Sequence, residues 1–316
     1  MKSKKTNALV LFSGGLDSIL AVKILQDQGI KTTPLCFESE FFSCDKAREA
    51  AKENGIEIRI ADISQKHWEI VKNPRYGRGA GANPCVDCHL LMLATAKEIM
   101  DREGFDLVAT GEVMGQRPMS QNKLSMEVAE KQSELAGRLL RPLSAKLLPE
   151  TEAEARKMID RAKLYDFSGR SRRPQLALAA RFGIKSIPQP AGGCVLTDPE
   201  YGRRLKELMA DYPDLGGCDA RLLRHGRVVR AGDLLAMIAR DKNECGALKQ
   251  QVCAGDCLFA PENFSGPTVL IRDLAKICSG KIAAPFEVVK KLGRDLVLRH
   301  SKKIPPVPKI SIIAAR

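Results

Sequence analysis

The first stretch with residue types suited to chemistry is Ser-Gly-Gly-Leu-Asp-Ser at residues 13–18, between an apolar run and a helical pattern. Such a loop presents backbone N–H groups at a helix N-terminus, which is an anion site. Gly14 and Gly15 allow close approach, and the hydroxyls of Ser13 and Ser18 add donors. Asp17 would be repelled by a phosphate unless a cation such as Mg²⁺ lies between them. The loop therefore predicts phosphate and Mg²⁺ binding, and the alternative is a glycine-rich turn in which Asp17 caps the helix.

Three of the ten cysteines form a second candidate group. Cys85 and Cys88 form a CxxC at the start of a predicted helix, and Cys194 follows two glycines that let the backbone approach a buried group closely. A structural zinc ion normally takes four ligands, and His89 is too close to Cys88 along the chain to share its metal. The residues alone leave a pair of redox thiols, a structural zinc site and a functional metal site open.

The remaining cysteines have less distinctive settings. Isolated ones such as Cys36 and Cys278 are predicted to be small core residues. Cys245, Cys253 and Cys257 form a looser group whose spacing differs from the commonest zinc motifs, so we interpret it as structural. Because a chain of this size needs no disulfides for stability, we expect thiols, metal ligands or redox groups in a reducing compartment.

Alternating strands and helices must position these groups. The strands are predicted at 7–12, 31–37, 57–63 and 105–111, and the helices at 18–29, 45–55 and 88–104. The alternation predicts an α/β fold with a doubly wound, Rossmann-like parallel sheet over residues 1–198. Ligands of such sheets bind beyond the carboxyl ends of the strands, where loop 13–18 and segment 111–116 both fall.

Residues 164–198 are rich in Gly, Pro and Arg and are interpreted as connecting segments. Residues 199–316 are then predicted to form a second, smaller α+β domain. Its helices are expected at 200–212, 244–253 and 285–293, its strands at 227–240 and 268–274, and an extended tail at 302–310.

The formal net charge of +13 favours a polyanionic partner, with RNA or DNA first. Residues 199–316 contribute +8, from 21 Lys and Arg against 13 Asp and Glu, and residues 1–198 contribute +5. A charge that only keeps the protein in solution is the alternative. No apolar run approaches the roughly 20 residues of a membrane helix, and the apolar run after the basic start is too short for a signal peptide. We therefore expect a cytoplasmic protein with no membrane partner.

The motif at residues 13–18 resembles the signature of the PP-loop ATP pyrophosphatases, which cleave ATP between its α- and β-phosphates. Residues 107–121, LVATGEVMGQRPMSQ, and residues 139–150, LLRPLSAKLLPE, are similar to segments of the tRNA 4-thiouridine synthases. Residues 83–89, NPCVDCH, resemble the tRNA 2-thiouridine synthases. The resemblance covers roughly residues 8–165 and adds Gly111 and Gln116 to the expected ATP-binding set.

The resemblance also implies a reaction. A tRNA uridine oxygen is adenylated with loss of pyrophosphate, and a sulfur nucleophile then displaces AMP. Some thiouridine synthases hold a 4Fe-4S cluster with three cysteines, which leaves one iron open to present sulfide. This implies catalytic roles for Asp17, Cys85, Cys88 and Cys194, with the three cysteines also as cluster ligands. Persulfide-carrying cysteines, structural zinc and inert thiols remain alternatives.

Residues 222–250 and 264–272 are similar to a small RNA-binding domain of ribosome quality-control (NFACT-type) proteins, in which a basic strand pair and a turn recur. Residues 240–243 stand at that turn here. The 4-thiouridine synthases carry a tRNA-binding module before the PP-loop and a rhodanese-type sulfur carrier, and neither is evident in these 316 residues. We therefore expect residues 199–316 to capture tRNA; a solvated basic face is the alternative.

Together these features predict an ATP-dependent tRNA sulfurtransferase, with 4-thiouridine favoured as the product. A tRNA 2-thiouridine synthase is the first alternative. A PP-loop enzyme acting on a small molecule and a non-catalytic, nucleotide-dependent RNA-binding protein are the others. The expected partners are tRNA and a sulfur donor, either sulfide or a cysteine desulfurase, and a homodimer is compatible with the sequence.

Overall fold

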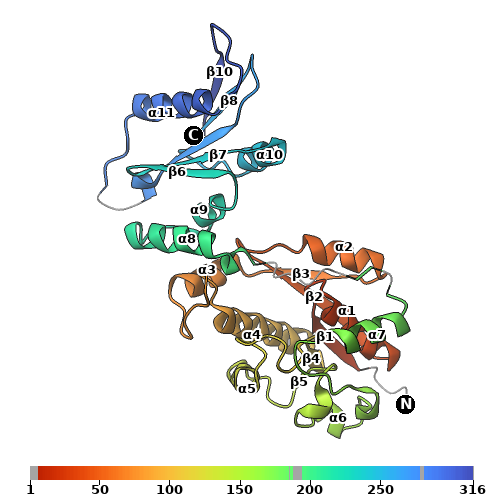
Figure 1. Cartoon of the computed structure of the whole chain (residues 1–316). Coiled ribbons are helices and arrows are strands. Elements are labelled where there is room, and N and C mark those ends of the chain that lie inside the picture. Colours follow the sequence, from red (N-terminus) through yellow and green to blue (C-terminus); the bar gives the residue numbers. More distant parts are fainter. Residues whose placement is uncertain (1–5, 185, 188–193, 278–280, 316) are drawn as a thin grey trace. The chain divides into compact units, whose positions relative to one another are not determined.

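The computed structural model describes residues 6–184, 186–187, 194–277 and 281–315 (Figure 1). The chain divides into two compact units, Met1–Cys194 and Val195–Arg316, with the boundary four residues before the position expected from the sequence. Cys278 and the two glycines before Cys194 lie outside the described residues. None of the described helices is both long enough and apolar enough to cross a membrane.

The first unit is built on a parallel five-stranded sheet in the order β3-β2-β1-β4-β5. Its strands are β1 (Asn7–Leu11), β2 (Lys31–Glu38), β3 (Arg59–Asp62), β4 (Leu107–Ala109) and β5 (Leu139–Leu140). Its helices are α1 (Leu16–Asp27), α2 (Asp45–Glu53), α3 (Ser64–Lys72), α4 (Cys85–Glu103), α5 (Lys123–Gln132), α6 (Glu152–Ala155) and α7 (Arg173–Arg181), with 3-10 turns at Ala145–Leu147 and Arg161–Lys163.

Helices cover both faces of this sheet because its strands are apolar on both sides. On β1, Ala8 and Val10 face a cluster with α1, α2 and α7, whereas Leu9 faces a cluster with α4 and α5. Strands buried on both faces are typical of doubly wound parallel sheets. The predicted fold class is confirmed for this unit, and the strand order reverses between β1 and β4, which is where such sheets bind ligands.

The second unit contains an antiparallel five-stranded sheet in the order β10-β8-β9-β7-β6. Its strands are β6 (Arg227–Ala231), β7 (Leu234–Ile238), β8 (Cys257–Pro261), β9 (Val269–Asp273) and β10 (Ile310–Ala314). Its helices are α8 (Pro199–Asp211), α9 (Gly217–Leu222), α10 (Lys242–Gln250) and α11 (Phe286–Arg299), with 3-10 turns at Val195–Thr197 and Leu274–Ile277.

The core of this sheet is formed with α11, whose Val289, Leu296 and Val297 pack against residues of β7, β8 and β9. Gly293 faces the ring of Phe259, and a Cβ atom at this position would overlap that ring. Glycine therefore lets the helix approach the sheet closely. The predicted smaller α+β domain is confirmed in class.

Candidate functional site

Loop 13–18 lies at the carboxyl end of β1 and leads into α1. Gly14 has φ +74°, and a Cβ atom there would lie 2.7 Å from Cα of Ala47, so only glycine fits. The hydroxyl of Ser18 donates to the carbonyl of Gly15 at 2.8 Å, and the backbone N–H of Ser18 bonds the same carbonyl. Ser13 is exposed. The loop therefore has the glycine-dependent backbone of an anion cradle, with the exposed hydroxyl of Ser13 accepting only a long hydrogen bond of 3.4 Å from the backbone N–H of Gly15.

Asp17 is the unusual member of the loop. Its Oδ2 accepts a hydrogen bond of 3.1 Å from Nε2 of Gln116, whereas its buried Oδ1 has no hydrogen-bond partner among the described residues. Burial raises the pKa of this carboxyl, and the hydrogen bond from Gln116 and the charge of Arg172 act in the opposite direction. A buried carboxylate oxygen without a partner is costly. Since Mg²⁺ prefers carboxylate oxygen ligands, this atom fits the expected cation.

The segment after β4 packs directly on this loop. A Cβ atom at Gly111 would lie 2.5 Å from the carbonyl carbon of Asp17 and 2.6 Å from the backbone nitrogen of Ser18. The two loops therefore meet backbone to backbone, and the hydrogen bond from Gln116 to Asp17 lies beside this contact. The seven residues predicted to bind ATP come from these two loops: Ser13, Gly14, Gly15, Asp17, Ser18, Gly111 and Gln116.

Sequence reasoning missed the cations around Asp17. The charges of Arg172 and Arg117 lower the pKa of Asp17 against the effect of burial, so both lie within electrostatic reach of the carboxylate. Gln175, in the first turn of α7, is fully buried and also interacts with Asp17. The Gly/Arg-rich segment that holds Arg172 was interpreted as a connection. Its arginine content was the available signal, because arginine is suited to phosphate recognition.

The three candidate cysteines are near one another in the first unit. Burial raises the pKa of the Cys88 thiol, and the charges of Cys194 and Cys85 raise it further, so each of these two thiols lies within electrostatic reach of Cys88. Cys85 begins α4, and its sulfur lies 3.0 Å from Nδ2 of the buried Asn83. Asp87, between the two cysteines, accepts backbone hydrogen bonds from Arg75 and Tyr76 and fixes the loop before the helix.

Three thiols are chemically suitable ligands for an iron–sulfur cluster. The positions of these three thiols, however, are not those of a metal site. Across the part of the chain that the structure describes, no group of three or more His, Cys, Asp or Glu side chains is gathered closely enough to hold a metal ion. Cys245, Cys253 and Cys257 are likewise not gathered closely enough, among the described residues, to hold a metal ion. Cys257 is buried in β8.

A buried charge network joins the two sides of the site. Oε2 of Glu112 accepts hydrogen bonds of 3.0 Å from Nε of Arg141 and from the hydroxyl of Thr110. Oε1 of Glu112 lies 3.0 Å from Nε2 of His89, the residue after Cys88 in α4, without hydrogen-bond alignment. Arg141 also donates to Glu130 at 2.8 Å. Burial alone would raise the pKa of Glu112, but the charges of His89 and Arg141 lower it below its usual range.

This network explains why two distant motifs occur together. Glu112 belongs to the segment at 107–121 and Arg141 to the segment at 139–150, and each needs the other as a buried counter-ion. Through Gly111 the strand end contacts loop 13–18, and through Glu112 it contacts the helix that carries Cys85 and Cys88. The phosphate loop and the thiol helix are therefore connected by two adjacent residues.

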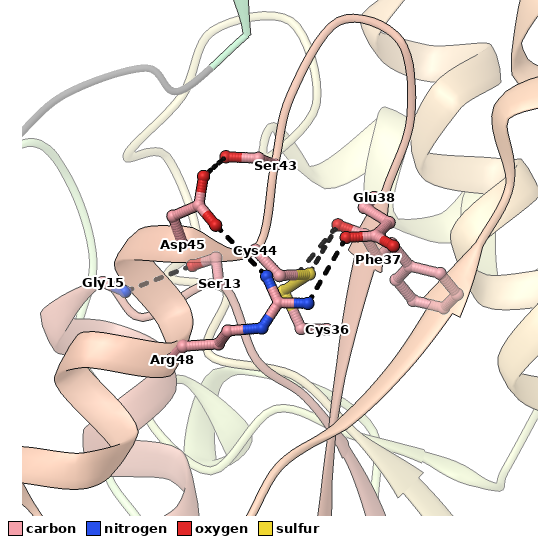
Figure 2. Close-up of a disulfide and its surroundings, with 9 residues drawn as sticks. All are labelled: Ser13, Gly15, Cys36, Phe37, Glu38, Ser43, Cys44, Asp45 and Arg48. Atoms are coloured by element: carbon pink, nitrogen blue, oxygen red, sulfur yellow. Dashed lines mark hydrogen bonds and ion pairs between the residues drawn. A yellow bond between two sulfur atoms is a disulfide. The ribbon is translucent and has the colours of Figure 1, made fainter. Parts of the chain in front are cut away.

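The expectation that the cysteines are thiols, metal ligands or redox groups is wrong for Cys36 and Cys44. Cys36 is buried as expected, but it is bonded to Cys44 in a disulfide with a Cα–Cα distance of 6.2 Å (Figure 2). The bond joins the end of β2 to the residue that precedes α2, the helix whose first turn contacts Gly14. This pairing could not be predicted from the sequence, because only the fold brings the strand end and the helix start within bonding range.

Residues 6–151 match the sequence model of a family described as the tRNA methyl transferase HUP domain. This match supports the PP-loop resemblance over these residues, which are less than half of the chain. Among curated relatives, a tRNA-specific 2-thiouridylase MnmA 3 of Bacteroides fragilis is 36% identical over 115 residues, which are 35% of this chain and 32% of that protein. A tRNA-specific 2-thiouridylase MnmA of Syntrophotalea carbinolica is 32% identical over 125 residues, 35% of this chain and 36% of that protein. The chain spans about a third of the length of these relatives.

Two solved structures are also similar in part. One is described as a predicted subunit of tRNA methyltransferase from Methanocaldococcus jannaschii, with a TM-score of 0.33 and 20% identity over 43% of this chain and 67% of that chain. The other is a 4-thiouridine synthetase–RNA complex with bound ATP, with a TM-score of 0.37 and 19% identity over 66% of this chain and 51% of that chain. Likenesses this distant carry no argument about function. The resemblance of residues 199–316 to an RNA-binding domain stays a prediction.

Proposed function

We propose that this protein is an ATP-dependent tRNA sulfurtransferase, which adenylates a uridine and replaces its oxygen with sulfur. One observation carries the proposal. The strand end at Gly111 and Glu112 contacts the phosphate loop at Asp17 on one side and the CxxC helix at His89 on the other. A loop for ATP and a group of thiols beside it are the two parts that such a reaction needs. The curated relatives named as 2-thiouridylases support the same class of reaction.

In the first step, the loop backbone and Ser13 hold the phosphates of ATP, with Arg172 and Arg117 as further positive charges. The uridine oxygen attacks the α-phosphate, and pyrophosphate leaves. Mg²⁺ bound at Asp17 would neutralise phosphate charge. The role of Asp17 is to offer a carboxylate oxygen, Oδ1, that has no hydrogen-bond partner among the described residues.

In the second step, a sulfur nucleophile attacks the activated ring carbon, and AMP leaves with the former uridine oxygen. We assign this step to Cys85, Cys88 and Cys194, with sulfide or a cysteine desulfurase as the source of sulfur. In the cluster alternative, the three cysteines would hold a 4Fe-4S group, which would supply an open iron for sulfide. In the persulfide alternative, a cysteine desulfurase would supply the outer sulfur, which attacks the ring carbon. A second cysteine thiolate would then release the product by forming a disulfide with the first, and a thiol reductant would restore both thiols. The iron content of anaerobically purified protein distinguishes the two: about four irons per chain for the cluster, and an active, iron-free protein for the persulfide.

The position of the sulfur on the uridine ring is a separate question. The segment at 107–121 favours 4-thiouridine, whereas the curated relatives are named for 2-thiouridine. We propose 4-thiouridine, with the basic second unit supplying tRNA capture. Nucleoside analysis of tRNA from a deletion strain tests this, and loss of 4-thiouridine alone is expected. Loss of 2-thiouridine alone would support the alternative product, and an unchanged nucleoside profile would contradict tRNA thiolation.

A further inference from the structure

The positive charge of the second unit is concentrated at its C-terminal end. Residues 199–280 carry 12 Lys and Arg against 11 Asp and Glu, whereas residues 281–316 carry 9 against 2. Nearly all of the net charge of this unit therefore arises from its last 36 residues, which contain α11, β10 and the segment between them. The basic strand pair and turn at 227–243, which the sequence singled out, add little net charge.

Many arginines before residue 281 already have acidic partners. Arg230 contacts Asp211 at 2.6 Å, and Arg240 pairs with Glu244 inside the turn that resembles an RNA-binding motif. The same holds on α8 and at the buried centre of the unit, where the pairs are Arg203 with Glu200 and Glu207, Arg204 with Glu200, and Arg272 with Asp219 and Asp256. A paired cation must first leave its partner before it can bind a phosphate.

The cations of the C-terminal end are different. Six of them have no ion pair within the described residues: Lys291, Arg294, Arg299, Lys302, Lys303 and Lys309. All but Arg294 are exposed, and Arg294 is partly buried. They lie on α11 and on the segment that follows it, and we name them the C-terminal basic surface.

The backbone under this surface is held in place. The apolar side of α11 packs on the sheet through Val289, Leu296 and Val297. After the helix, Asn263 fixes the extended segment through two hydrogen bonds, from its Nδ2 to the carbonyl of Val307 at 3.0 Å and from the backbone N–H of Lys309 to its Oδ1 at 2.8 Å. Three prolines at 305, 306 and 308 stiffen the same segment. The cations therefore lie on an ordered backbone, and binding of a ligand carries no free-energy cost for ordering the chain.

We infer that the C-terminal basic surface binds the phosphate backbone of a folded RNA, and that this surface, rather than the strand pair at 227–243, captures the nucleic acid. Exposed Lys and Arg side chains on a fixed scaffold can contact phosphates without first breaking an ion pair, and phosphate contacts supply affinity and register. An anionic membrane is disfavoured, because a helix that lies in a lipid surface must insert its apolar face, and that face of α11 is buried on the sheet. The inference rests on the proposed function only for the identity of the RNA as tRNA.

The test compares two triple variants of the full chain that remove the same charge. In Arg299→Gln/Lys302→Gln/Lys303→Gln the changes fall on the basic surface, and in Arg203→Gln/Arg204→Gln/Arg240→Gln they fall on paired arginines. Binding of an unmodified tRNA transcript is titrated between 0.05 and roughly 0.3 M salt. We expect the first variant to bind about tenfold or more weakly near 0.15 M salt, with the slope of log K against log salt reduced by about 2–3. The second variant should bind within about threefold of the unchanged protein.

Equal losses in both variants would mean that only total charge matters and would overturn the inference. A larger loss in the paired-arginine variant would place RNA at the turn instead, with the same consequence. Vesicles containing anionic lipid are the second probe, and competition by them that exceeds competition by an unrelated folded RNA would favour a membrane and contradict the inference. Because the assay contains no ATP and no sulfur donor, its result is independent of the thiolation chemistry.

Discussion

Beside loop 13–18 of the first unit, Glu112 and Arg141 are buried and paired with each other, whereas most cations of the C-terminal basic surface are exposed and none has an ion pair among the described residues. A buried charge needs its partner, so one substitution in the first unit should have a large and local effect. The interactions of an exposed cation are screened by water and salt. Substitutions on the second unit should therefore have small, additive and salt-dependent effects on ligand binding. On the proposed function, the contrast separates the region proposed to perform the chemistry from the region proposed to bind RNA.

The largest effect is expected for Asp17→Asn. The amide cannot anchor a cation, so pyrophosphate release in the presence of tRNA should fall by about 10³-fold, in line with the loss of one preorganised electrostatic group. The fold should persist and be as stable as before or more stable, because burial of the carboxylate without a partner for Oδ1 is a cost that the amide relieves. Thermal unfolding of the protein without nucleotide measures the second effect.

The matched control for this change is Asp295→Asn, at an exposed position of α11. It makes the same atomic replacement in the other region and should leave pyrophosphate release within about twofold. Equal activity of the two variants would remove Asp17 from the reaction, and formation of ADP by the unchanged protein would contradict the PP-loop chemistry.

The next effect concerns the buried pair of Arg141 and Glu112. Arg141→Met leaves a buried carboxylate without its main counter-ion, so the free energy of unfolding should fall by about 3–5 kcal/mol. The double variant Arg141→Met/Glu112→Leu should recover much of this loss. Arg299→Met on the basic surface should change stability by less than about 0.5 kcal/mol. Denaturant titration of the unchanged protein and the three variants measures these free energies of unfolding. A decrease for Arg141→Met as small as that for Arg299→Met would contradict the difference between the two regions.

A smaller effect is expected from the disulfide beside the loop. Replacing Cys36 and Cys44 by alanine together should lower stability by about 2–3 kcal/mol, because the bond closes a loop with a sequence separation of 8. Reductant should destabilise the unchanged protein by a similar amount and leave the double variant unaffected. The same response to reductant in both proteins would mean that the bond does not form in solution.

The smallest effect is a pH dependence. His67 is fully buried between Phe41 and Phe42, and burial lowers its pKa to about 4. The unfolded chain binds a proton near the ordinary pKa of 6.5, whereas the folded chain does not until about 4. Stability from this group is therefore complete above pH 6.5 and is lost as the pH falls towards 4, by about 2 kcal/mol between pH 7 and 5. His67→Phe should flatten this part of the stability profile, and an unchanged profile would exclude His67 as its source.

The sequence predicted the parts whose pattern is local. Apolar runs separated by periodic helices defined the parallel sheet, and the glycines of loop 13–18 defined its turn. It did not predict β5 or β8, which are short or lack alternation, and it placed α7 in a connection because the segment before it is rich in Gly and Arg. The pairings of Arg141 with Glu112 and of Cys36 with Cys44 were not predictable, because they depend on which elements the fold brings together.

The same limit applies to charge. Counting Lys and Arg identified the second unit as basic. Only the ion pairs seen in the structure distinguish a cation that already contacts a carboxylate from one that can bind a phosphate directly. The turn at 240–243 resembled an RNA-binding motif in sequence, and the structure pairs its Arg240 with Glu244. The basic surface on α11 had no motif and became evident from burial and pairing together.

The central claim is most directly tested by incubating the full chain, anaerobically, with ATP, Mg²⁺, an unmodified tRNA transcript and both sulfur donors, namely sulfide and a cysteine desulfurase with cysteine and a thiol reductant. Nucleosides and nucleotides are then measured in the same reaction. The account predicts thiouridine in the tRNA, with AMP and pyrophosphate formed in equal amounts, and loss of all three products in Asp17→Asn. Cys88→Ser should lose thiouridine. The absence of thiouridine from an ATP-cleaving reaction, or cleavage of ATP to ADP, would contradict the account.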